Sequence, residues 1–382
     1  MLNLIYFIPI IMKFQVSKAI IFKSLTHLQG IVDKKNTLPV LSNILLDAKD
    51  NTLTLSSTDM DISIVDSIKC TVLEEGATTI NSQIIYDIVR KLDDNSEIEI
   101  ISNDGKILTL RANGSRFSLA CLPKEEFPII DQDNDGSVIK INSKILFTLI
   151  DKTKFAISNE ETRYFLNGLY FNIHNQDKKS TLTLVGTDGH RLAKFSHGIE
   201  QNIDQVTGVI IPKKTINELS KLLSDIDEDI EIIISSNKIV FFINKLIFIS
   251  KLIDGNFPDY KRVIPDENKN IIDINREQLL SAVDRVSTIA NEKSPVVKFK
   301  IMKDIINLNT INSENSTATE DLKLSYDGDE FEIGFNSRYI MDMINNLEDE
   351  KISIKLRDGS SPIIAQEKSN PNLIYVLMPM RV

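Results

Sequence analysis

The sequence predicts an α+β protein of three similar domains, each made of two βαβββ-like half-repeats, and two repeated features predict it. The first is a 12-residue segment, typified by residues 142–153 (NSKILFTLIDKT), that occurs in six versions. The second is the group of short alternating strands that follows each version. The versions are spaced by about 60 to 70 residues, and a fixed period of this kind marks a repeat architecture. They begin at Ser17, Asn81, Asn142, Pro212, Asn275 and Asn336.

Each of these segments is typical of a short amphipathic helix. In the second version Ile84, Ile85, Ile88, Val89 and Leu92 fall on one side of a 3.6-residue period. Four versions open on Asn, which is a favourable N-cap, one opens on Ser, and one on Pro, which suits the first helical position. We therefore expect six helices, two in each domain.

The strands follow two patterns. After the second, fourth and sixth helices the residues alternate, turn at Asp-Gly or Ser-Asn, and alternate again, as in a hairpin. These hairpins are predicted at residues 97–101 and 107–110, 229–234 and 239–242, and 351–356 and 362–364. The other helices lead into longer apolar strands, predicted at residues 38–47, 163–173 and 294–301. In the first two domains Leu-Thr-Leu and then Thr-Asp follow, at residues 53–55 with 58–59 and at 182–184 with 187–188.

Composition agrees with several modest cores in a reducing compartment. The chain has 382 residues, of which 42% are hydrophobic, so three domains of ordinary size can each bury a core. Cys70 and Cys121 have no CxxC spacing, and we expect core thiols without a metal cage. Residues 1–11 are apolar but too short for a membrane span and lack the basic region of a signal peptide. We interpret them as an upstream translation start or a disordered extension before Met12, and we expect no membrane segment.

Charge separates the helices from the rest of the chain. The net charge is −10, yet the six helical segments contain 12 basic and 6 acidic residues. If the helices share one face, that face attracts a polyanion. The competing interpretation is that Lys and Arg simply suit a solvated helix face. The sequence has no helix-turn-helix spacing, zinc finger, aromatic RNA-binding strand or tryptophan, so contacts to nucleic acid should involve phosphates and weaken with salt.

Candidate catalytic residues do not converge in the sequence. His27, His174, His190 and His197 belong to no HExxH motif, and the GxSxG, Walker and GxGxxG motifs are missing too. Residues 187–193 (TDGHRLA) gather Asp, His and Arg, but they read as a hairpin turn and an outgoing strand, in which His190 and Arg191 point to opposite faces. We therefore expect no catalytic residue, metal ligand or cofactor, and we expect a binding role for this segment.

Several segments, in this order and spacing, resemble the bacterial sliding clamp family, the beta subunits of DNA polymerase III. The resemblance extends over residues 12–382. It is carried by residues 12–14 (MKF), 37–43 (TLPVLSN), 163–168 (RYFLNG), 187–193 (TDGHRLA), 251–265 (KLIDGNFPDYKRVIP), 290–293 (ANEK), 335–336 (FN) and 375–382 (YVLMPMRV).

The resemblance implies a DNA clamp fold, in which two head-to-tail subunits form a ring with helices lining the hole around duplex DNA and sheets outside. The domains would span residues 12–132, 138–264 and 265–382, after the extension at 1–11. The implied function is that of a non-catalytic processivity factor, which tethers the polymerase to DNA of any sequence. It also implies a cytoplasmic homodimer and partners that include the polymerase, a clamp loader and repair proteins. The alternative is a repeat-built scaffold or enzyme with no nucleic-acid role.

In the family one cleft on the second and third domains receives a short peptide motif from each partner. Apolar and methionine side chains would form an adaptable floor, and polar side chains at the edge would fix the peptide backbone. Ser294, Ser360 and Val382 replace larger side chains of the family, which implies a shallower pocket. The resemblance assigns to this cleft Leu166, Thr187, Gly189, His190, Arg191, Leu192, Pro258, Arg262, Val263, Asn336, Tyr339, Pro362, Met378, Pro379, Met380 and Arg381. It assigns to the DNA-facing surface Lys35, Arg90, Phe165, Lys213 and Lys214.

Overall fold

The computed structural model describes residues 12–32, 38–103, 106–130, 135–176, 179–201, 203, 208–291, 295–312 and 314–381. In this part of the chain six α-helices begin one residue into the six repeated segments, which confirms the predicted helices. They are α1 (Lys18–Gln29), α2 (Ser82–Lys91), α3 (Ser143–Asp151), α4 (Lys213–Leu223), α5 (Arg276–Ser287) and α6 (Ser337–Asn345).

The strands complete the predicted α+β repeat, with β5 as one addition to the βαβββ pattern. The first third contains β1 (Met12–Ser17), β2 (Asn43–Lys49), β3 (Thr52–Thr58), β4 (Ile62–Lys69), β5 (Thr71–Glu74), β6 (Gly76–Asn81), β7 (Glu97–Ser102), β8 (Ile107–Ala112) and β9 (Ser115–Ala120). The middle third contains β10 (Ser137–Asn142), β11 (Gly168–Gln176), β12 (Lys179–Thr187), β13 (Arg191–Ile199), β14 (Val209–Pro212), β15 (Asp229–Ile234), β16 (Lys238–Ile243) and β17 (Leu246–Lys251). The last third contains β18 (Asn270–Asn275), β19 (Val296–Met302), β20 (Ile305–Ile311), β21 (Thr317–Lys323), β22 (Phe331–Asn336), β23 (Lys351–Leu356), β24 (Ile363–Glu367) and β25 (Leu373–Leu377).

Asparagine side chains cap four of the helices, as the repeat predicts. The side-chain oxygen of Asn336 accepts hydrogen bonds from the backbone N–H groups of Arg338 and Tyr339, at 3.0 and 3.4 Å. Asn81, Asn142 and Asn275 accept equivalent bonds at α2, α3 and α5. These bonds satisfy amide groups that have no partner inside the helix, and each fixes the residue at which its helix starts.

Two of the long strands predicted after the helices begin later than expected. Residues 39–42 form a 3₁₀ helix, η1 (Pro39–Ser42), because Pro39 has no N–H to donate to a sheet, and β2 starts only at Asn43. Residues 161–166 form the 3₁₀ helix η4 (Glu161–Leu166), and β11 starts at Gly168. A Cβ at Gly168 would lie 2.3 Å from the carbonyl oxygen of Ile211, so glycine is required where this strand begins. On the apolar side of α2, Ile85 and Val89 are buried, whereas Ile84 is 47% exposed.

Four sheets organise the described strands. Two of them have eight strands, in the orders β10-β15-β16-β17-β4-β3-β2-β6 and β14-β11-β12-β13-β25-β24-β23-β18. The others have the orders β5-β1-β7-β8-β9 and β21-β20-β19-β22. The antiparallel pairs β17–β4 and β13–β25 therefore continue a sheet from one third of the chain into the next.

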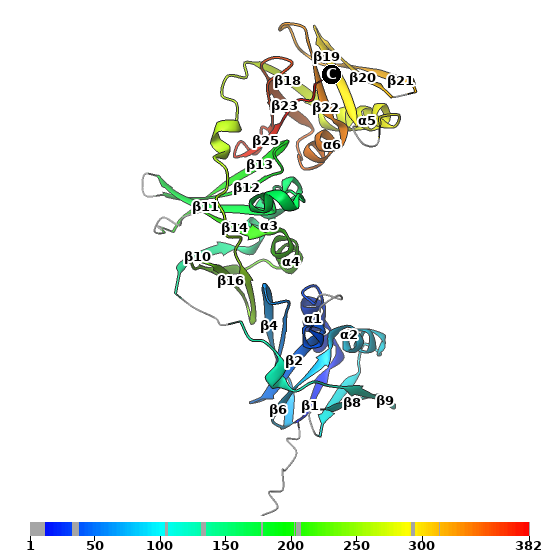
Figure 1. Ribbon diagram of the computed structural model, residues 1–382, viewed down its shortest axis with the longest axis vertical. Coiled ribbons are helices and arrows are strands. Elements are labelled where there is room, and N and C mark those ends of the chain that lie inside the picture. Colours follow the sequence, from blue (N-terminus) through cyan, green and yellow to red (C-terminus); the bar gives the residue numbers. More distant parts are fainter. Residues whose placement is uncertain are drawn as a thin grey trace, which may run out of the picture. The chain divides into compact units, whose positions relative to one another are not determined.

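The chain divides into two compact units, one comprising Met1–Lys144 and Asn217–Leu252 and the other Ile145–Ile216 and Ile253–Val382. In the first unit α1 and α2 lie side by side against the strands of the first third (Figure 1), and Ile21, Leu25, Ile85 and Val89 are buried there. In the second unit α5 and α6 lie side by side in the same way. The core of each unit therefore lies between paired helices and sheets.

Candidate functional site

The turn between β12 and β13 is held by side chains of the TDGHRLA segment. The hydroxyl of Thr187 donates to the carbonyl of Arg191 at 2.6 Å and accepts from the N–H of Gly189 at 3.1 Å. The Asp188 carboxylate accepts from the N–H groups of His190 and Arg191 at 2.9 and 3.0 Å. Gly189 has a φ of 87°, which disfavours any residue with a Cβ. The predicted hairpin is confirmed, and four hydrogen bonds within the turn support its conformation.

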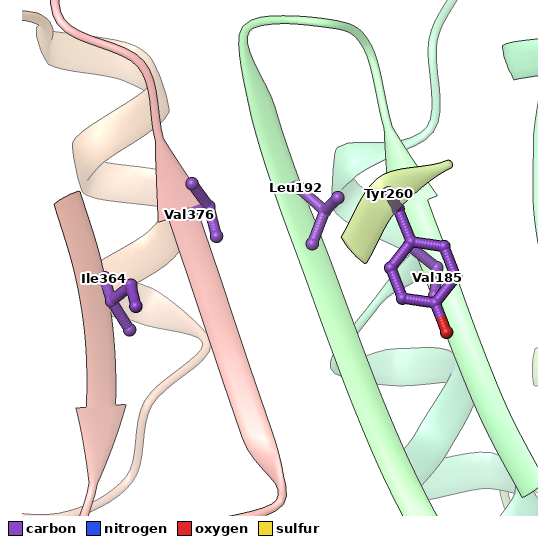
Figure 2. Close-up of a cluster of buried hydrophobic side chains, with 5 residues drawn as sticks. All are labelled: Val185, Leu192, Tyr260, Ile364 and Val376. Atoms are coloured by element: carbon purple, nitrogen blue, oxygen red, sulfur yellow. The ribbon is translucent and has the colours of Figure 1, made fainter. Parts of the chain in front are cut away.

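A cavity of about 330 Å³ opens beside this turn. Its base adjoins a cluster of five buried side chains, drawn in Figure 2: Val185, Leu192, Tyr260, Ile364 and Val376. Four of them lie on neighbouring strands, and Tyr260 comes from the 3₁₀ helix η5 (Tyr260–Val263). The cavity is lined by Arg163, Phe165, Leu166, Thr187, Gly189, Arg191, Leu192, Pro258, Asp259, Tyr260, Val263, Val376 and Met378. It is an apolar pocket with charged groups at its edge, which suits a short apolar peptide.

Arg191 is committed to contacts within the protein. Its side chain is 12% exposed, and its Nε and Nη1 atoms donate to Asp188 at 3.1 Å and to Asp342 at 2.6 Å. Its Nη2 donates to the carbonyl of Phe155 at 2.9 Å. The guanidinium carbon also lies 4.5 Å from the centre of the Tyr339 ring. Arg191 therefore joins the β12–β13 turn to α6 and cannot offer a free guanidinium to a bound peptide.

His190 and Tyr339 form a shelf next to the cavity. Their ring centroids are 6.2 Å apart and the ring planes differ by 22°. Burial, together with the Asp188 carboxylate, raises the pKa of Tyr339, so its hydroxyl stays protonated at neutral pH. The last residues border this shelf, because the N–H of Met378 donates to the carbonyl of His190 at 2.9 Å.

Other residues assigned to the cleft lie outside the cavity wall. Asn336 uses its side-chain oxygen to cap α6, which leaves only its amide N–H groups for a peptide. Arg262 is 85% exposed and pairs with Asp259 at 2.9 Å. The carbonyl of Pro362 accepts from Asn268 at 2.9 Å. Met380 donates its N–H to the carbonyl of Gly334 at 2.8 Å, while Pro379 is half-buried and Arg381 exposed.

The structure brings eight of the sixteen assigned residues into the cavity wall and adds others that the assignment missed. Arg163, Asp259, Tyr260 and Val376 lie inside the motifs that carried the resemblance, but spacing alone gave no sign that they face the same space. Phe165, assigned to the DNA-facing surface, also lines this cavity. Ser360 is in a turn where its N–H and hydroxyl both donate to Asp358 at 2.8 Å. Ser294 and Val382 lie outside the described residues.

The residues assigned to DNA are in varied surroundings. Arg90 pairs with Asp87 at 3.0 Å and is 53% exposed, and Lys214 is exposed. Lys213 donates to Asn159 at 2.7 Å, and burial, with help from Arg191, lowers the pKa of its amine. Lys18, counted among the basic helix residues, is buried and bonded to Asp94 at 2.7 Å. Lys35 lies outside the described part of the chain.

Within the described residues, no group of three or more His, Cys, Asp or Glu side chains could hold a metal ion. In the same part of the chain, none of the helices is both long enough and apolar enough to cross a membrane.

Comparison with known proteins identifies the fold and the family. A sliding clamp from Bartonella birtlesii, crystallised with griselimycin, superposes with a TM-score of 0.94 at 40% identity over 97% of this chain and 100% of that one. A Caulobacter crescentus clamp with bound polyethylene glycol gives 0.94 at 40% identity over 97% and 99%. The protein therefore has the architecture of a DNA sliding clamp.

The sequence comparisons specify which clamp family this is. Models of the DNA polymerase III beta subunit match residues 12–131 (N-terminal domain), 140–259 (central domain) and 261–381 (C-terminal domain). Beta sliding clamps of Caulobacter vibrioides and Escherichia coli K12 are 40% and 34% identical over 372 residues, which are 97% of this chain and all of each relative. The chain belongs to the family of DNA polymerase III beta subunits, the bacterial sliding clamps. This confirms the resemblance and excludes a scaffold or enzyme unrelated to nucleic acid.

Proposed function

We propose that two copies of this chain form a head-to-tail ring around duplex DNA, to which the polymerase, the clamp loader and repair proteins bind through short apolar peptides. The ring would retain its partners by topology, with no active site of its own. Residues 12–132, 138–264 and 265–382 would be its three repeated domains. The single observation that best supports peptide binding is the apolar cavity bordered by the His190–Tyr339 shelf.

The sheet edges support the homodimer. In the described chain β9 and β21 each end a sheet, with one side of the strand unpaired. On β9 Phe117 and Leu119 are half-buried and alternate with exposed residues, and on β21 Ala318 and Leu322 do the same. An unpaired alternating edge is a template for pairing with another chain. We propose that β9 of one subunit pairs with β21 of the other.

Retention on DNA tests the ring. After loading, the protein should remain on closed circular duplex DNA and leave the same DNA once it has been cut to a linear form. Native mass should give a dimer at the concentration used. Equal retention on circular and linear DNA, or a monomer that still persists on circles, would overturn the ring proposal.

Peptide affinity tests the cleft. Met378 lines the cavity and is 38% exposed, so Met378→Ala should weaken binding of a fluorescent peptide from the polymerase about tenfold, roughly 1.4 kcal/mol. Met60, 42% exposed in the turn between β3 and β4, does not line the cavity and is the control, and Met60→Ala should leave the affinity unchanged. Equal affinities for both variants would remove Met378 from the site.

The last residues provide a second test. Deletion of residues 378–382 should abolish polymerase binding and leave the dimer intact, because in the structure β25 already ends at Leu377. A truncated protein that runs as a monomer would instead assign these residues to the fold.

A further inference from the structure

Lys194 is a half-buried lysine of β13 that lies among apolar side chains. In the sheet it faces Val185 of β12 on one side and Ile374 of β25 on the other. Val185 belongs to the buried cluster of Figure 2, and Ile374 packs against that cluster. Side chains that face one another across antiparallel strands have Cβ atoms about 4.5 to 5.5 Å apart. The stem of Lys194 therefore lies against an apolar surface, and its amine is partly withdrawn from water.

The charge closest to the Lys194 amine is another cation. Within the described part of the chain Lys194 makes no ion pair, and Lys261 of η5 acts on it through like-charge repulsion. Burial, and then the charge of Lys261, lower the pKa of the Lys194 amine. The carboxylate of Asp259, just before η5, is already paired with Arg262 at 2.9 Å. No carboxylate of the described residues therefore holds Lys194 in its charged form.

These surroundings meet two conditions that make a lysine nucleophilic. An amine attacks through its lone pair, which only the neutral form has, and both desolvation and an adjacent cation favour that form. Burial on a strand is not enough to produce this state. Lys298 of β19 is also half-buried, but it pairs with Glu332 at 3.4 Å and so has the partner that Lys194 lacks. Lys298 is therefore a matched reference for Lys194 within the same compact unit.

Lys261 adds a group that binds an anion beside this amine. It is exposed, and in the described chain it makes no ion pair. An ammonium group is a common binding group for phosphate. A donor that carries both a phosphate and an electrophilic carbon could therefore bind to Lys261 and present its carbon to Lys194. Acyl phosphates have both groups joined through one oxygen atom.

We propose that Lys194 is a site of acylation by acyl phosphates, with Lys261 holding the phosphate of the donor. The neutral amine of Lys194 attacks the carbonyl carbon, a C–N bond forms, and the bond from that carbon to the phosphate oxygen breaks. The phosphate leaves with the bonding electrons, and the surplus proton of the amine passes to water. The product is an amide, so one positive charge is lost together with its repulsion from Lys261. The site is separate from the residues assigned to the peptide and to DNA.

Reaction with acetyl phosphate tests the proposal. The full-length protein would be treated briefly, and the initial rate at each lysine would be measured by mass spectrometry of its proteolytic peptides. Lys194 should be acetylated at least about threefold faster than Lys298, because more of its amine is neutral near pH 7. Its rate should also stop rising at a lower pH than the rates of exposed lysines, which a difference in access alone would not produce.

Substitutions of the neighbouring cation test the second part of the proposal. Lys261→Gln should slow acetylation of Lys194 about threefold and leave the rate at Lys298 unchanged, whereas Lys261→Arg should keep most of the rate because it keeps the charge. Lys269→Gln is the control, since Lys269 is an exposed lysine between η5 and β18. The rate at Lys194 should not change in this control. Thermal melting of the variants should agree, which shows that a change in rate is not a loss of folding.

Three results would overturn the proposal. The first is acetylation of Lys194 that is no faster than acetylation of Lys298. The second is an equal rate at Lys194 in the Lys261→Gln and Lys269→Gln proteins. The third comes from an uncharged acetyl thioester used as a second donor: it has no phosphate, so its preference for Lys194 over Lys298 should be smaller. An equal preference with both donors would exclude phosphate binding by Lys261.

Discussion

Substituting Arg191 by lysine tests whether this side chain holds the β12–β13 turn against α6 or binds the peptide directly. Arginine reaches Asp188, Asp342 and the carbonyl of Phe155 at once and stacks on Tyr339. Lysine keeps the charge, but a single ammonium group cannot reach three acceptors on separate elements or stack as a plane. Losing two charge-assisted bonds at a side chain that is 12% exposed should cost about 3 kcal/mol of folding free energy.

The assay combines urea unfolding of the full-length protein with peptide affinity. Because the substitution frees Tyr339 and the turn that carries His190, peptide affinity should fall about tenfold, roughly 1.4 kcal/mol. Arg163→Lys is the matched control, since Arg163 lines the same cavity but is 35% exposed and pairs with Glu160 on its own 3₁₀ turn. That control should lose about 0.5 kcal/mol or less. If the two variants unfold at the same urea concentration and bind peptide equally, Arg191 does not stabilise the contact between the β12–β13 turn and α6.

Two further predictions concern the turn and the buried carboxylate. Gly189→Ala should destabilise the protein by about 1 to 2 kcal/mol and weaken peptide binding, because φ is 87° there and a residue with a Cβ is strained in that conformation. Gly198→Ala, with nothing within 4 Å of the added Cβ, should unfold like the unsubstituted protein, and equal losses would refute the account from backbone strain. Burial alone would raise the pKa of Asp66, but hydrogen bonds from His27 and Ser24 hold it below its usual range in the folded protein. Its stabilisation is therefore present above the unfolded pKa and is lost as pH falls through the folded one. Asp66→Asn should therefore be less stable than the unsubstituted protein near pH 7 and should lose less stability as the pH falls through the acid range. Equal loss of stability in acid for both proteins would count against the His27 contact.

The helices were the most predictable part of the fold. Asn caps and a 3.6-residue period are local signals, so all six starting residues could be read from the sequence. The strands after α1 and α3 were less predictable, because apolar runs do not distinguish a strand from a 3₁₀ turn. After the 3₁₀ turn at residues 161–166, the strand β11 begins only at Gly168, where the backbone approaches the carbonyl oxygen of Ile211 too closely for a Cβ. This contact joins residues far apart in the sequence, so no local pattern predicts it. The error matters, since that turn places Phe165 and Leu166 in the cavity wall.

The family resemblance grouped Leu166 and Met378 with the TDGHRLA turn, and in the structure Leu166, Met378, Thr187, Gly189, Arg191 and Leu192 line one cavity. The resemblance did not give the contacts that each of these side chains makes. It could not show that the Arg191 guanidinium donates a hydrogen bond to Asp342, because the two residues are 151 positions apart in the sequence.

The strand pairs β4–β17 and β13–β25 have a mechanical consequence. Each pair joins successive thirds of the chain through five facing residue pairs. A force that separates those thirds must therefore break several backbone hydrogen bonds at once. If a loader opens the proposed ring, the yielding seam should be the one between separate polypeptides, where no covalent connection limits how far the edges can part.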